Sequence, residues 1–352
     1  MTARATDLSL AVRIGALFTT GIVSLVSGQS DDAWVFAVHG AAGWALGLVV
    51  GWKWRRVWRR IGRPGSGRGA WASALVVATL ASGFVWSSGG DLYIAGLNLM
   101  SWHFVLGVAL ALVVLLHAGR RARPIARADL VGRRQLLHAA AVVVAGVAAW
   151  QLQRPAAALA GWRGARRRFT GSYESGSFSG NDFPATSWVA DRPRPLSSDH
   201  RLRVDGLTEA PFAIAARELG ARDALVATLD CTGGFYSTQR WRGVRLGRLI
   251  DRAGPLPEAA HVRVISRTGY HWSFGLAEAR GLLLATTVGD EPLSHAHGAP
   301  ARVVAPGRRG FQWVKWVDRI ELHEHPDPGA AASTLWSSAT ATGRGEACLR
   351  RL

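Results

Sequence analysis

The chain has 352 residues, 49% of them hydrophobic and 19% charged, a balance that excludes a disordered polyelectrolyte. Lysines and arginines number 42 against 24 acidic residues, so the formal net charge is +18. Such a basic chain often binds nucleic acid, but here the basic residues flank long apolar runs. This arrangement favours a membrane, and we expect no nucleic-acid partner. Two cysteines are too few for a disulfide-framework domain.

The first half of the sequence carries five apolar runs that end before residue 155. A spanning helix needs about 20 apolar residues, which the first four runs supply and the fifth approaches. Tryptophans fall near the ends of these runs, where the membrane interface would lie. We therefore predict an all-α transmembrane bundle over residues 1–153, with spans at 8–27, 33–52, 70–88, 97–118 and 136–152.

The connecting loops predict the orientation of this bundle. Basic residues gather between the second and third spans and after the fourth, whereas the other two loops carry Asp31, Asp32 and Asp91 and no base. By the positive-inside rule, the N-terminus is cytoplasmic and the second half of the chain lies outside the cell membrane. Arg133 and Arg134 precede the fifth span in a pattern similar to a twin-arginine export signal, and an ordinary positive-inside anchor explains them equally well.

Four histidines fall within the apolar half, where ionisable side chains are costly and often functional. His39 and His103 lie at similar depth near the outer face, and His117 and His138 lie at the inner level. Imidazoles from different helices at one depth suit axial ligation of a b-type haem. We predict an outer haem on His39 with His103 and an inner haem on His117 with His138. The alternatives are buried hydrogen bonding for the first pair and interfacial placement for the second.

Two stretches of the bundle resemble the helices of bacterial di-haem cytochrome b membrane subunits. They are His39-Gly-Ala-Ala-Gly…Trp54-Arg-Arg and Trp102-His103…His117-Ala-Gly-Arg. The resemblance covers about residues 8–153. It implies one or two b-type haems, with membrane lipid and quinone as partners.

The second half of the sequence is more polar and rich in short alternating segments. Residues 154–180 are rich in arginine, glycine and serine and predict a linker. Residues 181–326 favour a single α+β domain, and residues 327–352 predict a flexible tail. The predicted strands are 202–204, 225–229, 261–265, 301–304 and 317–322, and the predicted helices are 214–220, 245–253 and 276–281.

Four motifs follow one another in this domain. They are Leu229-Asp-Cys231-Thr-Gly-Gly with Trp241-Arg-Gly-Val, then Ser266-Arg-Thr-Gly-Tyr270, then Gly289-Asp-Glu-Pro-Leu with His297-Gly-Ala-Pro-Ala-Arg302, and last Pro306-Gly307…Gly310 with Val314-Lys315-Trp316. In this order they resemble the molybdopterin-binding domain of the sulfite oxidase family, over about residues 181–325. In style they are closest to that family's bacterial periplasmic methionine-sulfoxide reductase catalytic subunit.

A thiolate that follows a strand in a glycine-containing turn is a soft ligand for a transition metal. The resemblance implies Cys231 as the molybdenum ligand and catalytic residue, where a lone buried cysteine would otherwise be a small hydrophobe. Arginine and lysine suit the terminal phosphate of a pterin. The implied pterin contacts are His297, Arg302 and Lys315, with Ser266 and Asn181 as further polar contacts.

Departures from the family pattern bear on the substrate. Sulfite-oxidising members place an arginine shortly after the metal-binding cysteine, where this chain has Tyr236 and Gln239 before Arg240. No counterpart of the family's dimerisation domain follows, so the oligomeric state is left open. We predict a membrane-anchored molybdenum enzyme that exchanges electrons with haem and quinone and favours an S-oxide or N-oxide substrate. A sulfite dehydrogenase with the same cofactors, or a cofactor-free binding module on a membrane anchor, are the alternatives.

Overall fold

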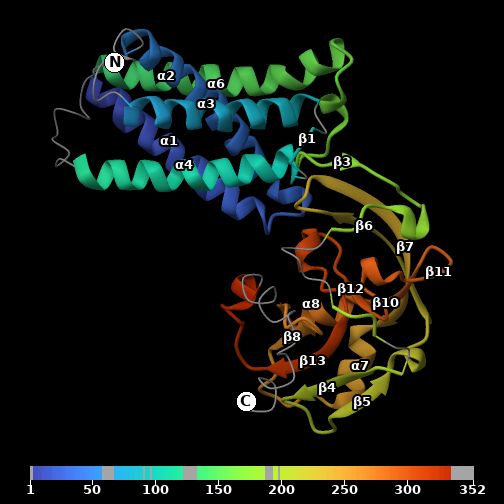
Figure 1. Ribbon diagram of the computed structural model, residues 1–352. Helices are drawn as coiled ribbons and strands as arrows, with labels where there is room; N and C mark the ends of the chain where they lie inside the picture. Colours follow the sequence, from blue (N-terminus) through green and yellow to red (C-terminus); the bar gives the residue numbers. More distant parts are fainter. Residues whose placement is uncertain are drawn as a thin grey trace. The chain divides into compact units, whose positions relative to one another are not determined.

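The computed structural model describes residues 3–57, 67–89, 92–95, 97–121, 133–186, 193–196 and 199–333 (Figure 1). The chain divides into two compact units, Met1–Tyr173 and Glu174–Leu352. The first unit is helical and the second is built mainly from strands. The predicted change of fold class along the chain is therefore observed.

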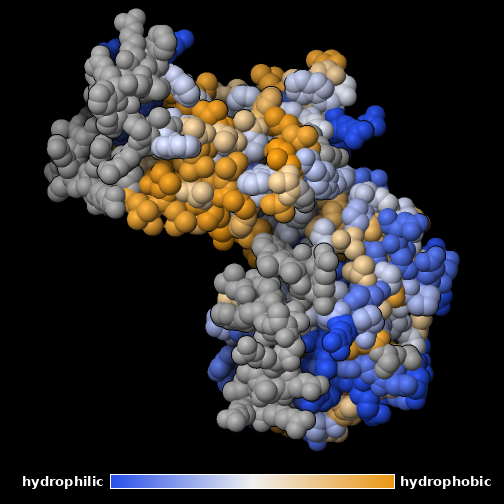
Figure 2. Space-filling view, in the orientation of Figure 1, coloured by the Kyte–Doolittle hydropathy of each residue, from blue (hydrophilic) through white to orange (hydrophobic). Residues whose placement is uncertain are grey.

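The described residues of the first unit include five long helices. Each is long and apolar enough to cross a membrane, and Figure 2 shows hydrophobic residues spread over this unit. Insertion into a membrane and its orientation stay predictions. The helices are α1 (Ala3–Ser24), α2 (Ala33–Val57), α3 (Gly67–Ser88), α4 (Leu99–Arg121) and α6 (Arg133–Leu159), and a short ribbon of β1 (Tyr93–Ile94) and β2 (Leu97–Asn98) precedes α4.

Small residues let α2 and α6 approach each other closely. A Cβ on Gly146 of α6 would lie 2.7 Å from the carbonyl oxygen of Ala41 and 2.8 Å from Cβ of Ala45, both on α2. Close backbone approach through glycine and alanine is typical of helix packing in membranes. Helix α2 also packs against α1, whereas α4 packs against α3 and α1.

The chain that follows α6 folds back onto the helical unit. The short helix η3 (Arg163–Arg166) packs against α6 and α3. Phe169 meets Phe36 edge-on with 5.6 Å between ring centroids, and the Arg167 guanidinium lies 4.3 Å from the ring centroid of Trp86. Part of the predicted linker 154–180 is thus either helix α6 or chain ordered by aromatic and cation–π contacts within the first unit.

Two sheets form the second unit. One runs β11-β10-β7-β3, with β12 also on β10 and β6 also on β7, and the other runs β5-β4-β13-β8-β9. The first contains β3 (Tyr173–Glu174), β6 (Asp223–Asp230), β7 (Phe235–Arg245), β10 (Leu283–Val288), β11 (Glu291–Pro292) and β12 (Arg302–Val304). The second contains β4 (Arg201–Gly206), β5 (Phe212–Ala215), β8 (His261–Ser266), β9 (His271–Gly275) and β13 (Val317–His323), and the helices are α7 (Leu246–Ala253) and α8 (Leu276–Gly281).

Alternating side chains explain why these segments form half-buried strands. In β8, Val262 and Val264 are fully buried, whereas His261 and Arg263 keep exposed surface. The core includes Trp241 and Trp313, whose ring centroids lie 5.7 Å apart. This aromatic pair lies beside the segments that carry the motifs.

The predicted elements of the second half are largely observed. All five predicted strands are present, as are the helices predicted at 245–253 and 276–281. The helix predicted at 214–220 is wrong, because β5 runs to Ala215 and a short turn, η5 (Ala216–Glu218), follows. Antiparallel pairing of β5 with β4 overrides the local helix propensity there.

The beginning of the predicted flexible tail is ordered against β9. Ser333 is fully buried, and its Oγ donates to the carbonyl oxygen of His271 over 3.1 Å. Asp327 pairs with the His271 ring over 2.9 Å. The remainder of the predicted tail, residues 334–352, lies outside the described residues.

Candidate active site

Cys231 lies in the tight turn between β6 and β7. Its backbone N–H donates to Phe235 O over 2.8 Å, and Gly234, at φ +97°, donates to the Cys231 carbonyl over 3.0 Å. The residue is buried, and its sulfur lies 3.2 Å from Thr186 Oγ1 and 3.3 Å from the Gly233 nitrogen. The sulfur therefore lies within hydrogen-bond distance of one hydroxyl and one backbone N–H.

A buried ion pair holds the backbone of this turn. Arg309 Nη1 donates to Asp230 Oδ1 over 2.6 Å, and neither side chain is more than 4% exposed. Arg309 Nη2 also donates to the Cys231 carbonyl oxygen over 3.3 Å. Gly310 follows, and a Cβ there would lie only 3.1 Å from Cys231 Cα. Loss of either charged partner would leave an uncompensated charge next to the cysteine.

Lys315, on the segment that precedes β13, binds the residue that lies against the cysteine sulfur. Its Nζ donates to the carbonyl oxygens of Thr186 and Ala296, each over 2.9 Å. Gly298, at φ +109°, permits this approach, because a Cβ there would lie 2.9 Å from Cβ of Lys315. Lys315 is thus joined to the cysteine sulfur through a single residue, Thr186.

His297 lies at the end of the short helix η6 (His295–His297) and is buried. Its Nε2 lies 3.0 Å from Phe183 O and donates to it, and its Nδ1 accepts from Ser294 Oγ over 2.8 Å. Burial, reinforced by the charge of Arg302, lowers the pKa of His297 to about 4. His297 is therefore neutral at pH 7, and both of its ring nitrogens position the protein's own chain.

Arg302 is a buried cation with no acidic partner among the described residues. It is 3% exposed, its Nη1 donates to His297 O over 3.1 Å, and its Nε has no hydrogen-bond partner in the described part of the chain. The guanidinium lies 5.2 and 5.7 Å from the ring centroids of Trp241 and Trp313. Burial lowers the pKa of Arg302 to about 9, and the nearby Cys231 opposes this shift. A buried guanidinium with an unused donor suits a bound anion.

The two remaining predicted pterin contacts make bonds within the protein. Asn181 Nδ2 donates to Glu291 Oε2 over 3.0 Å, and its Oδ1 accepts from the Ser294 N–H over 2.8 Å. Ser266 is buried, and its Oγ accepts from the Thr268 N–H over 3.3 Å. Asn181 holds the chain that leads into η6, and Ser266 shapes its own turn. A direct contact of either residue with a cofactor stays a prediction.

In the helical unit, His39 of α2 and His103 of α4 face each other. Their ring centroids are 6.1 Å apart and their planes are inclined by 80°. His39 Nδ1 lies 2.9 Å from Thr20 Oγ1, and His103 Nδ1 lies 3.1 Å from Ser82 Oγ and 3.0 Å from Thr79 O. The structure thus brings the predicted outer pair together and holds each ring through Nδ1.

No contact between the predicted inner ligands His117 and His138 is described. His138 Nδ1 donates to the carbonyl oxygen of Arg134, one turn earlier on α6. The side chain of His117 lies outside the described residues. An inner haem on these two residues stays a prediction.

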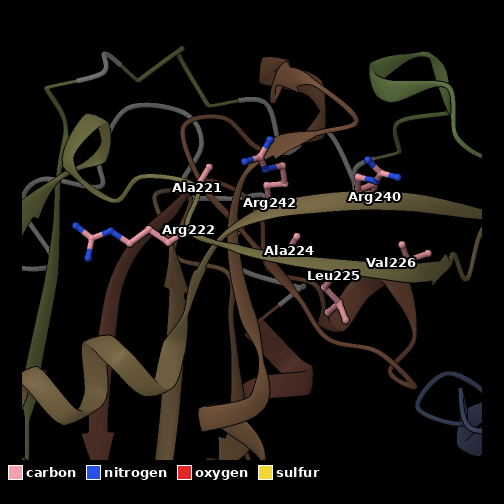
Figure 3. A pocket seen from close by; sticks show the side chains of 7 residues that line it. All are labelled: Ala221, Arg222, Ala224, Leu225, Val226, Arg240 and Arg242. Carbon is pink, nitrogen blue, oxygen red and sulfur yellow. The ribbon is translucent and has the colours of Figure 1, made fainter.

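An open groove of about 310 Å³ lies on the outer face of the β6–β7 hairpin (Figure 3). Arg240 and Arg242 of β7 lie opposite Val226 and Ala224 of β6 on this face. Arg240, the first arginine after Cys231, therefore belongs to the groove and not to the cysteine turn. The groove is lined by Ala221, Arg222, Ala224, Leu225, Val226, Arg240 and Arg242.

Comparison with known proteins identifies the second half of the chain. Residues 189–331 match the family model for the oxidoreductase molybdopterin binding domain. This stretch is a domain of that family. The prediction of a molybdenum-dependent oxidoreductase domain is therefore confirmed.

Three curated relatives are similar to this domain. The protein-methionine-sulfoxide reductase catalytic subunit MsrP of Gluconobacter oxydans is 28% identical over 47% of this chain and 56% of its own. A nitrate reductase (NADPH) of Beauveria bassiana is 31% identical over 38% of this chain and 18% of its own. Mitochondrial sulfite oxidase of Macaca fascicularis is 38% identical over 28% of this chain and 20% of its own. The chain thus spans less than two thirds of each relative.

Sequence reasoning missed the residues that hold the cysteine. Thr186 carries no motif, and it meets Cys231 across 45 residues of chain. Asp230 falls within the first motif and Arg309 within the span of the fourth, but their pairing joins positions 79 residues apart. A local pattern carries no signal for such contacts, because only the folded sheets bring the segments together.

The neutral His297 predicts a loss of stability in acid. Its pKa is about 4 in the folded protein against an ordinary 6.5, so the unfolded chain binds a proton first as the pH falls. The resulting stability is complete above pH 6.5 and is lost as the pH falls through 4. Melting temperatures measured from pH 7 to pH 4 should therefore fall more steeply for the parent than for His297→Gln.

A histidine on the surface supplies the control for this measurement. His325 is 81% exposed, and His325→Gln should follow the parent at every pH. Equal slopes for the parent and both variants would contradict the assignment of a neutral, buried His297.

Proposed function

We propose that the chain is a membrane-anchored, molybdopterin-dependent oxidoreductase that performs oxo transfer outside the cytoplasmic membrane. In this proposal, electrons are exchanged with quinone through haem in the helical unit. One observation carries it: within a domain of the molybdopterin-binding family, the buried Cys231 interacts electrostatically with the buried Arg302, which has no acidic partner among the described residues. A cofactor with an anionic end and a metal for the thiol would complete both groups.

The residues of the second unit fit a pterin that ends in a phosphate. Arg302 is buried, and its unpartnered Nε together with its planar shape suits bidentate binding of phosphate oxygens. Lys315 adds a second cation on the segment that packs against Gly298. The ordinary partners of buried cations are carboxylates, and Arg302 has none among the described residues, so an external anion is the partner that the site requires.

Each residue has a separate task in the proposed reaction. Cys231 would hold the metal as a thiolate, and the molybdenum cofactor would supply two-electron oxo transfer when bound. The ion pair of Asp230 and Arg309 keeps the turn in place, because Arg309 also binds the Cys231 carbonyl. Neutral His297 orients the carbonyl of Phe183 and keeps the following chain beside the sulfur.

We further propose that His39 and His103 ligate the iron of a b-type haem. Their ring centroids lie 6.1 Å apart, so both imidazoles would be within reach of one iron, which would carry single electrons through the helical unit. Hydrogen bonds from Nδ1 to Thr20 and Ser82 fix both rings, as the outer partners of metal-bound histidines do.

Two glycines leave room beside the proposed haem ligands. Gly43 follows His39 by four residues and Gly107 follows His103 by four, so each lies on the same helix face as its histidine. A Cβ built at either glycine has no described atom within 4 Å. A larger side chain there would enter the space that a porphyrin between α2 and α4 would occupy.

Reduction of an S-oxide is the proposed direction. Of the three relatives, the one named protein-methionine-sulfoxide reductase matches the largest share of this chain. A sulfite-oxidising site would need an arginine shortly after the cysteine. Here Gln239 is fully buried with its Nε2 donating to Gly176 O over 2.6 Å, and Arg240 lines the open groove. These placements disfavour the sulfite alternative.

Purified full-length protein should contain one molybdenum per chain. Cys231→Ser replaces the soft sulfur ligand, and molybdenum measured by mass spectrometry should fall by about tenfold or more. Cys348→Ser removes the other cysteine of the sequence and should leave the metal content unchanged. Absence of molybdenum from the parent, or full retention in Cys231→Ser, would contradict the proposal.

The haem assignment predicts a Soret absorption band that depends on both histidines. His39→Ala and His103→Ala should each remove at least half of the haem per chain, because each removes a proposed iron ligand. Gly43→Leu should do the same by filling the space, with both histidines intact. Gly51→Leu is the matched control on α2, since its position is also open. A parental Soret band in both histidine variants would refute the assignment.

A further inference from the structure

We propose that the hydroxyl of Thr186 is a positioning group for the metal-binding sulfur and raises the reduction potential of the molybdenum centre. This inference rests on the proposed function, and it concerns a residue outside every motif of the sequence. Thr186 Oγ1 lies 3.2 Å from Cys231 Sγ, within the range of a hydrogen bond to sulfur. Thr186 acts through the cysteine and is not itself a metal ligand.

The direction of this hydrogen bond follows from the chemistry of the sulfur. A cysteine that ligates a metal is a thiolate and has no proton to donate. The Thr186 hydroxyl must then be the donor, alongside the Gly233 N–H at 3.3 Å from the same sulfur. Two donors of different origin thus converge on one sulfur, and of the two only the hydroxyl can be removed by changing a side chain.

Hydrogen bonds to a ligating sulfur withdraw electron density from the metal. Reduction potentials of metal centres held by cysteine depend on such bonds for this reason. The bond stabilises negative charge on the sulfur and so favours the reduced, more electron-rich centre. Removal of the hydroxyl is expected to shift the midpoint potential to lower values, and return of a hydroxyl is expected to restore it.

Thr186 also links the sulfur to a proposed pterin anchor. Its carbonyl oxygen accepts from Lys315 Nζ over 2.9 Å, while its side chain contacts the sulfur. Lys315 also donates to the carbonyl oxygen of Ala296. The next residue, His297, binds the carbonyl oxygen of Phe183, which lies three residues before Thr186. The segment 183–186 is therefore fixed at both ends. This attachment places the hydroxyl beside the sulfur at little further entropic cost.

Variants at this position test the proposal directly. Thr186→Val keeps the branched shape and removes the hydroxyl, whereas Thr186→Ser keeps the hydroxyl. Thr186 is exposed, so neither change disturbs the core. Thr232→Val is the matched control, because Thr232 adjoins Cys231 in the chain and its hydroxyl makes no recorded bond to the sulfur among the described residues. Molybdenum content, the midpoint potential from redox titration and the Mo(V) electron paramagnetic resonance spectrum are measured for each full-length protein.

The expected result is a lower potential and an altered Mo(V) spectrum for Thr186→Val, with parental values for Thr186→Ser and Thr232→Val at equal molybdenum content. A parental potential in fully loaded Thr186→Val would overturn the role of the hydroxyl while leaving the proposed function intact. Loss of molybdenum from both Thr186 variants would overturn it as well, because the hydroxyl would then not be the determinant. A parent without molybdenum would instead refute the proposed function itself.

Discussion

A buried guanidinium without a carboxylate is the constraint on which the active-site proposal depends. Removal of Arg302 from water opposes its charge and lowers its pKa to about 9, and its described contacts are a carbonyl oxygen and two indole faces, with no carboxylate. A fold seldom retains such a group unless a ligand completes it. An anion bound at Arg302 would remove this penalty, so cofactor binding and stability of the second unit would be coupled.

The other cations near the thiol have different partners. Arg309 is paired with Asp230 and supports the backbone of the cysteine turn, and Lys315 is bound to carbonyl oxygens. Arg302 differs in having no acidic partner among the described residues, and its Nε has no hydrogen-bond partner there. In the helical unit the corresponding pair consists of two imidazoles that lie within hydrogen-bond distance of hydroxyl groups. These contrasting chemistries suit an anionic pterin in one unit and imidazole ligands for haem iron in the other.

The sequence was informative wherever one local pattern determined the outcome. Apolar runs predicted the five helices, alternation predicted β8 and β13, and the ordered motifs predicted the family of the second half. The helix predicted at 214–220 is wrong because β5 pairs with β4 and forms a strand there. Thr186 was missed for the same reason: it belongs to no sequence motif, and only the folded chain brings it into contact with Cys231. His297 was predicted as a pterin contact; its ring binds Phe183 and Ser294 in the structure, and a contact with a cofactor stays a prediction.

The most direct measurement of the central claim is the pterin content of Arg302→Gln compared with that of the parent. Pterin released from purified full-length protein is oxidised and quantified by fluorescence, with Arg242→Gln, on the open groove, as the matched arginine control. The account predicts one pterin per chain in the parent and in Arg242→Gln, and at least about a tenfold loss in Arg302→Gln, because the buried cation is the anion's partner. Full pterin content in Arg302→Gln would contradict it.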